Sequence, residues 1–533
     1  MAIAVLGAQT PAGATTQAPL ADANDVAQVL HYEQLMADHM QQGHAVEVDF
    51  DSAQRIAGHV VGTGGWGDSG LWTGVYEGGE AMRYQVAKQK LEGALSPDDR
   101  AFWAAQRDAA LARVRAIVAA EHVDINIAQD WSGTLVIPPE VNNGDPTTEK
   151  HLANFGGGVI HGQKGMIQRA CTPVGLGPLG VSDPTVDAAH PINDNSNRVF
   201  RITWKHGDGK TYNCETSPSR DTYAGVVFGL LSAFDFVSAD DPGMRRMIRT
   251  DLLSMGNFLW KYQWNYPRPD GYVSVEHDFD GFFSPLFVYT PEARLNVANA
   301  VHHVVDRGGK PLAKAKWSRI WAEELASQGP AVGISLEADA LQPHDSYYKW
   351  NLSHLIAFNL MRTTTGATRD LLAHGLAAMD RTTRDDVNAH FEAIMYSVTG
   401  EQSRLNAAVI HLHQWQGYRA AIEAGPVKNS VRCGRDITCV HSDQYAFGSP
   451  VGPAVWSPGN AGPRAASPLP VAERPPTDFL WQRDPGSLDG TQALTHRMPG
   501  IDFLTPYWMI RYLTEVAPPA LRPLPNWAGP PGI

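Results

Sequence analysis

The chain has few cysteines for its size. There are four among 533 residues, and no two of them have the CxxC spacing of a structural zinc site. Cys433 and Cys439 are close enough in sequence to close a small loop, and Cys171 and Cys214 bracket a glycine-rich segment. An even number of cysteines in loops suggests disulfides, although four cysteines permit three pairings. Since disulfides form in oxidising compartments, we expect a secreted or periplasmic protein.

Long apolar runs and basic clusters are also missing. No stretch of about 18 apolar residues is present, which argues against a membrane-spanning helix. The net charge is −13 without any basic run, whereas binding to phosphate backbones requires clustered Lys and Arg. We therefore expect neither a membrane nor a nucleic acid as a partner. Residues 1–24 are either the tail of a secretory signal without its basic region or a disordered Ala/Thr-rich leader.

Several catalytic signatures are absent as well. The chain has no GxSxG motif, no P-loop and no HExxH motif, so serine hydrolases, nucleotide-binding enzymes and metalloproteases lack their usual signals. We expect no metal site and no cofactor. The DxDD run of terpenoid-type cyclases is missing too, which disfavours a cyclase without excluding related isomerases.

What the chain does have is helical periodicity. Apolar residues recur with helical spacing in about twelve segments, and these segments alternate between two kinds. One kind opens with polar and aromatic clusters, at 66–72, 219–223, 344–348, 388–391 and 500–503. The other kind begins without such a cluster, often after Pro or a charged turn, and comprises 100–121, 242–264, 313–326, 367–380 and 403–423. Twelve helices in six inner and outer pairs indicate a mainly α fold, an (α/α)6 toroid in which the inner helices begin at one rim.

We expect residues 25–533 to form a single toroid domain, because no flexible linker divides the helical pattern. Segment 122–217 interrupts the helices and is predicted to be an insertion over one rim. Within it, a strand at 199–204 turns through His206-Gly207-Asp208-Gly209 into a second strand at 211–214, which indicates a β-hairpin.

The C-terminal part of the chain is predicted to close the ring of helices. Residues 424–499 are rich in Pro and Gly and lack periodicity, so we interpret them as an excursion from the toroid. The last helix, at 502–515, is expected to pair with the first one, at 25–43.

Three of the inner segments begin with WGDSGLWTG at 66–74, SRDTY at 219–223 and YYKWNLSH at 347–354. With these openings and the alternating helices, the chain resembles the six-hairpin (α/α)6 toroid proteins of the carbohydrate-active kind, over about 25–423 and 502–515. The resemblance is architectural and assigns no single family. It implies a pocket at the rim where the inner helices begin, and it carries over no catalytic residue.

Asp68 lies in the most distinctive of these openings, between Trp66 and Trp72 and among several glycines. A carboxyl group beside flat aromatic walls has the composition of a sugar-stacking subsite. The alternative is that Asp68 only caps its helix.

Asp221 opens another inner helix, after the N-cap candidate Ser219 and before Tyr223. From this position in the first turn, its carboxyl can point inward. A structural ion pair with Arg220 is the alternative.

The third opening places His344 and Asp345 before Tyr347, Asn351 and His354, which share one helix face through their i, i+4 and i+7 spacing. A polar and aromatic stripe on an otherwise apolar helix suggests a wet cavity, although a satisfied buried histidine is the commoner role for His354. The remaining predicted substrate-binding residues also open inner helices: Tyr348, His390 and Asp502.

These residues suggest cleavage of a glycosidic bond. Hydrolysis needs two carboxyl groups, and Asp68 and Asp221 come from different inner helices that can face each other, with Asp345 and His344 as further catalytic candidates. We therefore predict a secreted glycoside hydrolase or polysaccharide lyase that acts on an oligosaccharide or another small molecule. Two alternatives remain: a terpenoid-type cyclase or dehydratase–isomerase with aromatic stabilisation of a carbocation, and a non-catalytic glycan-binding protein whose Asp residues only cap helices.

Overall fold

The structure is a computed structural model that describes most of the helical part of the chain. The described residues are 22–130 except 55, 163–175, 201–267, 290–340, 347–415 and 500–516, together with 149–151, 272–274, 439–441, 463–465, 495–498 and residues 20, 180, 279, 471 and 485.

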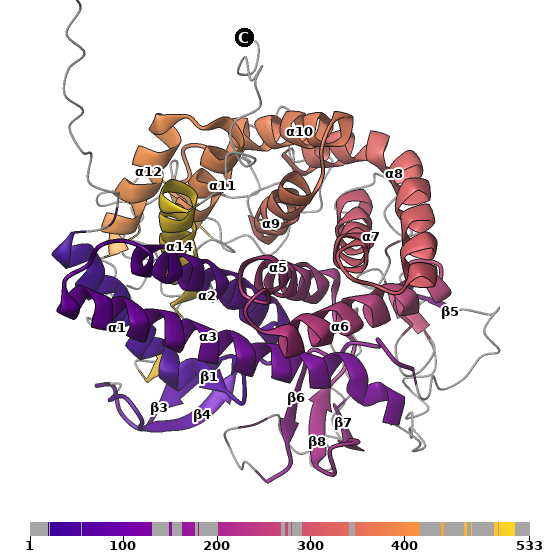
Figure 1. The fold of residues 1–533 in the computed structure, drawn as a ribbon, viewed down its shortest axis with the longest axis horizontal. Coiled ribbons are helices and arrows are strands. Elements are labelled where there is room, and N and C mark those ends of the chain that lie inside the picture. Colours follow the sequence, from indigo (N-terminus) through magenta and orange to yellow (C-terminus); the bar gives the residue numbers. More distant parts are fainter. Residues whose placement is uncertain are drawn as a thin grey trace, which may run out of the picture.

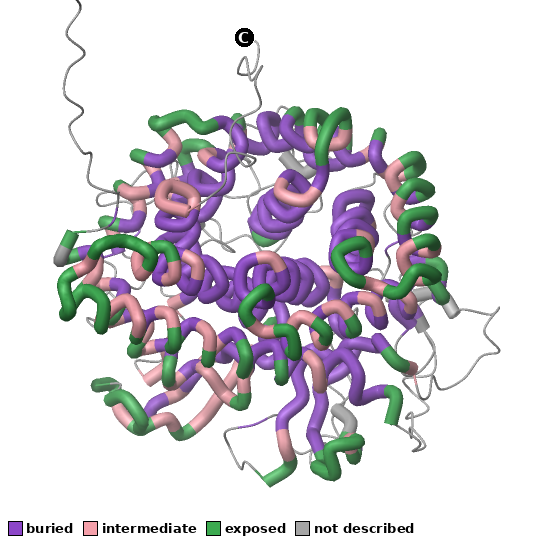
Figure 2. The backbone as a smooth tube through the Cα atoms, viewed as in Figure 1, coloured by how far each residue is buried: buried purple, intermediate pink, exposed green. Residues whose placement is uncertain are grey.

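The described residues are predominantly helical and form twelve α-helices, so the prediction of a mainly α protein is confirmed. Six of them are buried almost all round and are called the inner helices here: α2 (Ser69–Leu91), α5 (Arg220–Phe236), α7 (Thr290–Asp306), α9 (Tyr347–Thr363), α11 (Ala389–Thr399) and α14 (Ile501–Glu515). The other six bury only one face and are called the outer helices: α1 (Ala23–His39), α3 (Pro97–Asn126), α6 (Pro242–Lys261), α8 (Pro311–Ala340), α10 (Ala367–Thr383) and α12 (Gln402–His413). Figure 2 shows this contrast in burial between the two sets.

The inner helices contact one another in sequence order. Packing contacts lead from α2 to α5, α7, α9, α11 and α14, and from α14 back to α2. Each outer helix packs against the inner helix that is its partner in a hairpin, and α1 packs against α14 (Figure 1). The α14 helix contacts α2 more extensively than it contacts α1.

Glycines allow the closest of these contacts, between α2 and α5. A Cβ atom on Gly225 would lie 2.5 Å from the backbone oxygen of Leu71, and one on Gly229 would lie 2.7 Å from the backbone oxygen of Gly74. At the start of both helices, Gly70 lies against the side chain of Thr222. The two helices therefore run in parallel, and their first turns are neighbours.

Replacing Gly225 with alanine is expected to lower the free energy of unfolding. Alanine favours a helix by up to about 1 kcal/mol over glycine, but overpacking against rigid backbone costs about 1–3 kcal/mol or more. Gly333→Ala is the matched control, since a Cβ there would come no closer than 3.7 Å to another residue. Urea unfolding of both variants tests this, and a Gly225→Ala protein as stable as the wild type would contradict it.

Small antiparallel sheets flank the helices. The predicted hairpin is confirmed as β7 (Arg201–Lys205) and β8 (Thr211–Glu215), and β6 (Ala170–Pro173) pairs with the other edge of β8. A second sheet joins β3 (Glu47–Phe50) to β4 (Val60–Gly64) and β12 (His496–Arg497). The other described strands pair in twos: β1 (Met40–Gln41) with β2 (His44–Ala45), β5 (Glu149–His151) with β9 (Tyr272–Ser274), and β10 (Cys439–His441) with β11 (Pro463–Ala465).

One predicted disulfide is present. Cys171 and Cys214 lie directly opposite each other on β6 and β8 and are joined by a disulfide bond. Cys433 lies outside the described residues, as does the side chain of Cys439, so that pairing stays a prediction.

Candidate functional site

Neighbouring inner helices contact each other at their starts. The Arg220 guanidinium at the start of α5 donates to Thr290 Oγ1 of α7 at 2.9 Å. Asn388, the N-cap of α11, donates from Nδ2 to the Tyr347 hydroxyl at the start of α9, at 3.1 Å. Together with the Gly70–Thr222 contact, these bonds join the first turns of α2, α5 and α7 in one group and those of α9 and α11 in another.

His354 is the most informative side chain in this region. It is fully buried, and its ring stacks on Phe391 of α11 with 3.9 Å between ring centroids. Nδ1 lies 2.6 Å from the Trp350 carbonyl oxygen, which can only accept, so Nδ1 carries a proton. Burial lowers the pKa of His354 to about 4, and the ring is therefore neutral at pH 7. Its Nε2 atom then has a bare lone pair, which meets no hydrogen-bond partner among the described residues.

Asn351 lies one turn before His354 on the same helix face. It is fully buried, and neither its amide oxygen nor its amide nitrogen meets a partner within the part of the chain that the structure describes. Buried polar atoms nearly always have a hydrogen-bond partner, so an amide with two unpaired atoms requires an explanation. The amide of Asn351 and the Nε2 of His354, unpaired among the described residues, could both form hydrogen bonds to a polar ligand.

Other predicted residues surround this pair. His390 of α11 is buried, and its pKa is lowered to about 3 by burial and by the nearby His354. Tyr347 stacks on Phe391 with 5.7 Å between ring centroids. The structure thus brings four predicted site residues together at the start of α9 and α11: Tyr347, Asn351, His354 and His390.

Tyr223 offers a proton donor on α5, which packs against α9. Its ring is buried edge-on against Phe279, and its hydroxyl has no partner among the described residues. Burial raises the pKa of Tyr223 well above its ordinary value, so the hydroxyl stays protonated.

Asp68 and Asp221 lie at the starts of the neighbouring helices α2 and α5. Asp68 is the N-cap residue of α2, but its exposed side chain forms no capping hydrogen bond. Asp221 is half-buried in the first turn of α5, after Ser219 at the N-cap. The capping alternative for Asp68 therefore has no hydrogen bond to support it.

Arg169 holds these two helix starts in place, and sequence reasoning missed it. Its Nη1 donates to the Gly67 carbonyl and its Nε to the Ser217 carbonyl, both at 2.8 Å. It thereby ties together the segments that lead into Asp68 and Asp221. No local pattern marks this arginine, because its two partners are distant in sequence.

The other predicted residues are more dispersed. Trp72 is buried beneath Gly65, as a core residue would be, and Trp66 donates from Nε1 to Thr63 Oγ1 at 3.0 Å. Asp502 is buried in the first turn of α14, while Tyr348 is exposed. His344 and Asp345 lie outside the described residues.

Gly62, Gly64 and Gly67 have the GxGxxG spacing of a dinucleotide-binding loop. Gly62 and Gly64 belong to β4, and Gly67 lies between β4 and α2. That motif works where a parallel βαβ unit directs a helix start toward a pyrophosphate. Here β4 pairs antiparallel with β3, and Arg169 binds the Gly67 carbonyl. The surroundings therefore do not suit a dinucleotide.

A different group of buried acids lies deeper between α2, α3 and α6. Glu77 of α2 and Glu121 of α3 face each other, and their carboxyl oxygens meet no hydrogen-bond partner outside this pair among the described residues. Burial raises the pKa of Glu77 well above its ordinary value. Burial and the neighbouring Glu77 do the same for Glu121. Each of the two nearby aspartates has a histidine partner, His44 for Asp124 and His122 for Asp251.

Comparison of the chain with protein families, curated proteins and solved structures finds no significant match. Among the described residues, no group of three or more His, Cys, Asp and Glu side chains is placed to hold a metal ion. None of the described helices is long and apolar enough to cross a bilayer.

Proposed function

We propose that the protein is a secreted carbohydrate-active enzyme with an (α/α)6 toroid fold, whose substrate binds where the inner helices begin. The closed series of contacts through the six inner helices supports the toroid. The Cys171–Cys214 disulfide supports export to an oxidising compartment. The group around His354 supports the location of the substrate.

Within this class, the reaction that the site supports best is β-elimination in a uronate-containing polysaccharide. The observation that carries it is the neutral, buried His354, whose Nε2 lone pair has no partner among the described residues. In this proposal Nε2 removes the C5 proton of the uronate, a C4–C5 double bond forms, and the C4–O4 bond breaks. The leaving oxygen takes a proton from the Tyr223 hydroxyl, and a proton then returns from His354 to Tyr223. Asn351 donates to the uronate carboxylate and stabilises the charge that develops there.

The test is a product analysis with a panel of uronate-containing and neutral polysaccharides in H₂¹⁸O. A lyase gives unsaturated ends without ¹⁸O, and a hydrolase gives saturated reducing ends with ¹⁸O. Binding without turnover would favour the glycan-binding alternative, and turnover of a prenyl alcohol would favour the cyclase or isomerase. Either of these last results would reject the proposed function.

Hydrolysis is the second candidate, and the uncapped Asp68 favours it. Asp68 caps no helix and lies two residues before Gly70, which contacts Thr222 in the first turn of α5. In this mechanism it acts with Asp221 as an acid and base pair. This mechanism predicts ¹⁸O in the products and loss of turnover in both Asp68→Asn and Asp221→Asn.

Asp68→Ala is expected to change the free energy of unfolding by no more than about 0.5 kcal/mol, as for an ordinary surface substitution. Asp241→Ala is the matched control, because Asp241 caps α6 through bonds from the backbone N–H groups of Gly243 and Met244. Loss of that cap costs about 1 kcal/mol. If denaturant unfolding shows Asp68→Ala to be as damaging as Asp241→Ala, Asp68 is a structural cap after all.

A further inference from the structure

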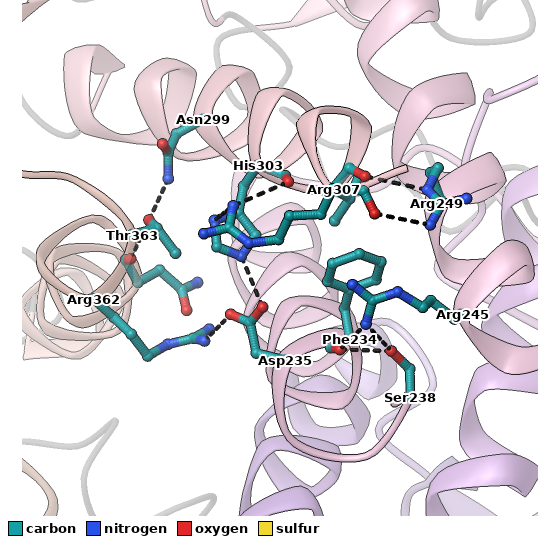
Figure 3. A network of polar contacts seen from close by, with 12 residues as sticks. Phe234, Asp235, Ser238, Arg245, Arg249, Asn299, His303, Arg307, Arg362 and Thr363 are labelled. Atoms are coloured by element: carbon teal, nitrogen blue, oxygen red, sulfur yellow. Dashed lines mark hydrogen bonds and ion pairs between the residues drawn. The ribbon is translucent and has the colours of Figure 1, made fainter. Parts of the chain in front are cut away.

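Arg362 lies in the last turn of α9, at the end of the inner helices opposite to the proposed substrate site. Its Nη1 donates to Asp235 of α5, and Asp235 also accepts from His303 Nε2 of α7 at 2.7 Å (Figure 3). Burial is the largest single influence and would raise the pKa of Asp235, but Arg362, His303 and Arg307 together outweigh it, so the pKa is lowered. The aspartate is therefore ionised, and its charge is already matched by one arginine.

The guanidinium of Arg362 is only partly used by these contacts. Its face lies over the Phe236 ring, 4.9 Å from the centroid, and one corner binds Asp235. The remaining edge is formed by Nε and Nη2, both buried and without a partner among the described residues. The side chain as a whole is only 6% exposed. Unpaired donors on a buried guanidinium are costly, because the group has lost its water without gaining an acceptor.

The same edge is filled in two other arginines of this chain, the buried Arg83 and the partly buried Arg294. Nε and Nη2 of Arg83 donate to the side-chain oxygen of Gln106. Nε and Nη2 of Arg294 donate to the two carboxyl oxygens of Glu324. This edge of a guanidinium matches two oxygens of a carboxylate or phosphate, and Arg362 presents it unoccupied.

The charges around Arg362 also favour an anion. Arg307 donates to the Nδ1 atom and the carbonyl of His303, while Arg245 and Arg249 donate to backbone carbonyls at the ends of α5 and α7 (Figure 3). Burial lowers the pKa of His303, so its ring is neutral at pH 7. The network drawn in Figure 3 therefore contains one ionised carboxylate, Asp235, and four positively charged arginines: Arg245, Arg249, Arg307 and Arg362.

We propose that the Nε–Nη2 edge of Arg362 binds an oxyanion, a carboxylate or phosphate group, beside Phe236 and at the ends of α5 and α9. The site is separate from the proposed substrate site and does not depend on the proposed function. Asp235 and Thr363 are partly exposed at this end of the helices, so the network around Arg362 lies near the surface.

The experiment is thermal unfolding of the full chain in increasing sodium phosphate, or sodium acetate, at an ionic strength held constant with sodium chloride. A ligand that binds only the folded state raises the unfolding temperature with its concentration. We expect a saturable rise with phosphate, and a rise with acetate as well if any two-oxygen anion suffices. Equilibrium dialysis of labelled phosphate should give one site per chain in the wild-type protein.

Arg362→Lys keeps the charge but removes the two-nitrogen edge. Loss of one charge-assisted hydrogen bond costs about 1.5–3 kcal/mol, so phosphate should bind at least about tenfold more weakly. The exposed Arg319→Lys on α8 is the control and should behave as the wild type does. An equal rise in chloride alone, no saturable phosphate binding by the wild-type chain, or unchanged binding by Arg362→Lys would each overturn the proposal.

Discussion

In the proposed lyase, replacing His354 with glutamine is expected to lower the rate of polysaccharide cleavage by about 10²–10⁴-fold, the usual contribution of a general base. Glutamine keeps a polar amide in this buried space, but it has no basic nitrogen to replace Nε2, whereas Nδ1 of His354 bonds the Trp350 carbonyl. Because the base acts in its neutral form, the rate should rise as the pH increases through the pKa of His354, which burial lowers to about 4. This residue then imposes no further pH dependence near neutrality.

Steady-state kinetics on the polysaccharide that gives unsaturated products measure this effect. His59→Gln is the matched control, since His59 is exposed and pairs only with Asp51 among the described residues. Circular dichroism must show that the His354→Gln protein is folded. A folded variant with wild-type turnover would remove His354 as the base and leave the carboxyl pair at Asp68 and Asp221 as the remaining mechanism.

The division into inner and outer helices was readable from the sequence. An inner helix is surrounded by other helices, so polar and aromatic clusters gather at its start, as at 219–223 for α5 and at 388–391 for α11. An outer helix has a solvent face along its whole length and needs no such cluster. The start of α7 shows no similar opening, although it contacts α5 through Thr290.

Helix ends were harder to predict than helix positions. The pattern at 313–326 ends before Pro330, yet α8 continues through this proline to Ala340. A proline inside a helix removes a hydrogen bond and costs about 3 kcal/mol. Packing of α8 against α7 and α10 is long-range, so a local pattern cannot show that this cost is offset.

The same limitation applies to the site. Asn351 and His354 share a face by helical geometry, which the sequence shows, but their proximity to His390 and Phe391 depends on how α9 meets α11. Glu77 is another example. In the sequence it is an ordinary helical glutamate, and only the fold places it opposite Glu121.

Glu77→Gln is expected to make the protein less sensitive to alkaline pH. In the folded protein the pKa of Glu77 is raised well above its ordinary value of 4.5, so the wild type retains a proton that the unfolded chain releases. Below pH 4.5 both states hold this proton and burial carries no electrostatic penalty. As the pH rises from 4.5 toward the folded-state pKa, the free energy of unfolding falls by up to about 1.4 kcal/mol per pH unit for each such proton.

Glutamine removes one titrating carboxyl and gives Glu121 an N–H donor in the same space, next to Gly229. The difference in unfolding free energy between variant and wild type should therefore grow in favour of the variant, by up to about 4 kcal/mol between pH 5 and pH 8. Burial also raises the pKa of Glu80 to about 8 and that of Glu392 to about 7, but both residues are present in the two proteins and cancel in the difference. Denaturant unfolding at several pH values measures this slope, with the exposed Glu323→Gln as a control that should follow the wild type. A Glu77→Gln protein whose stability declines with pH as steeply as that of the wild type would show that Glu77 does not retain its proton in the folded protein.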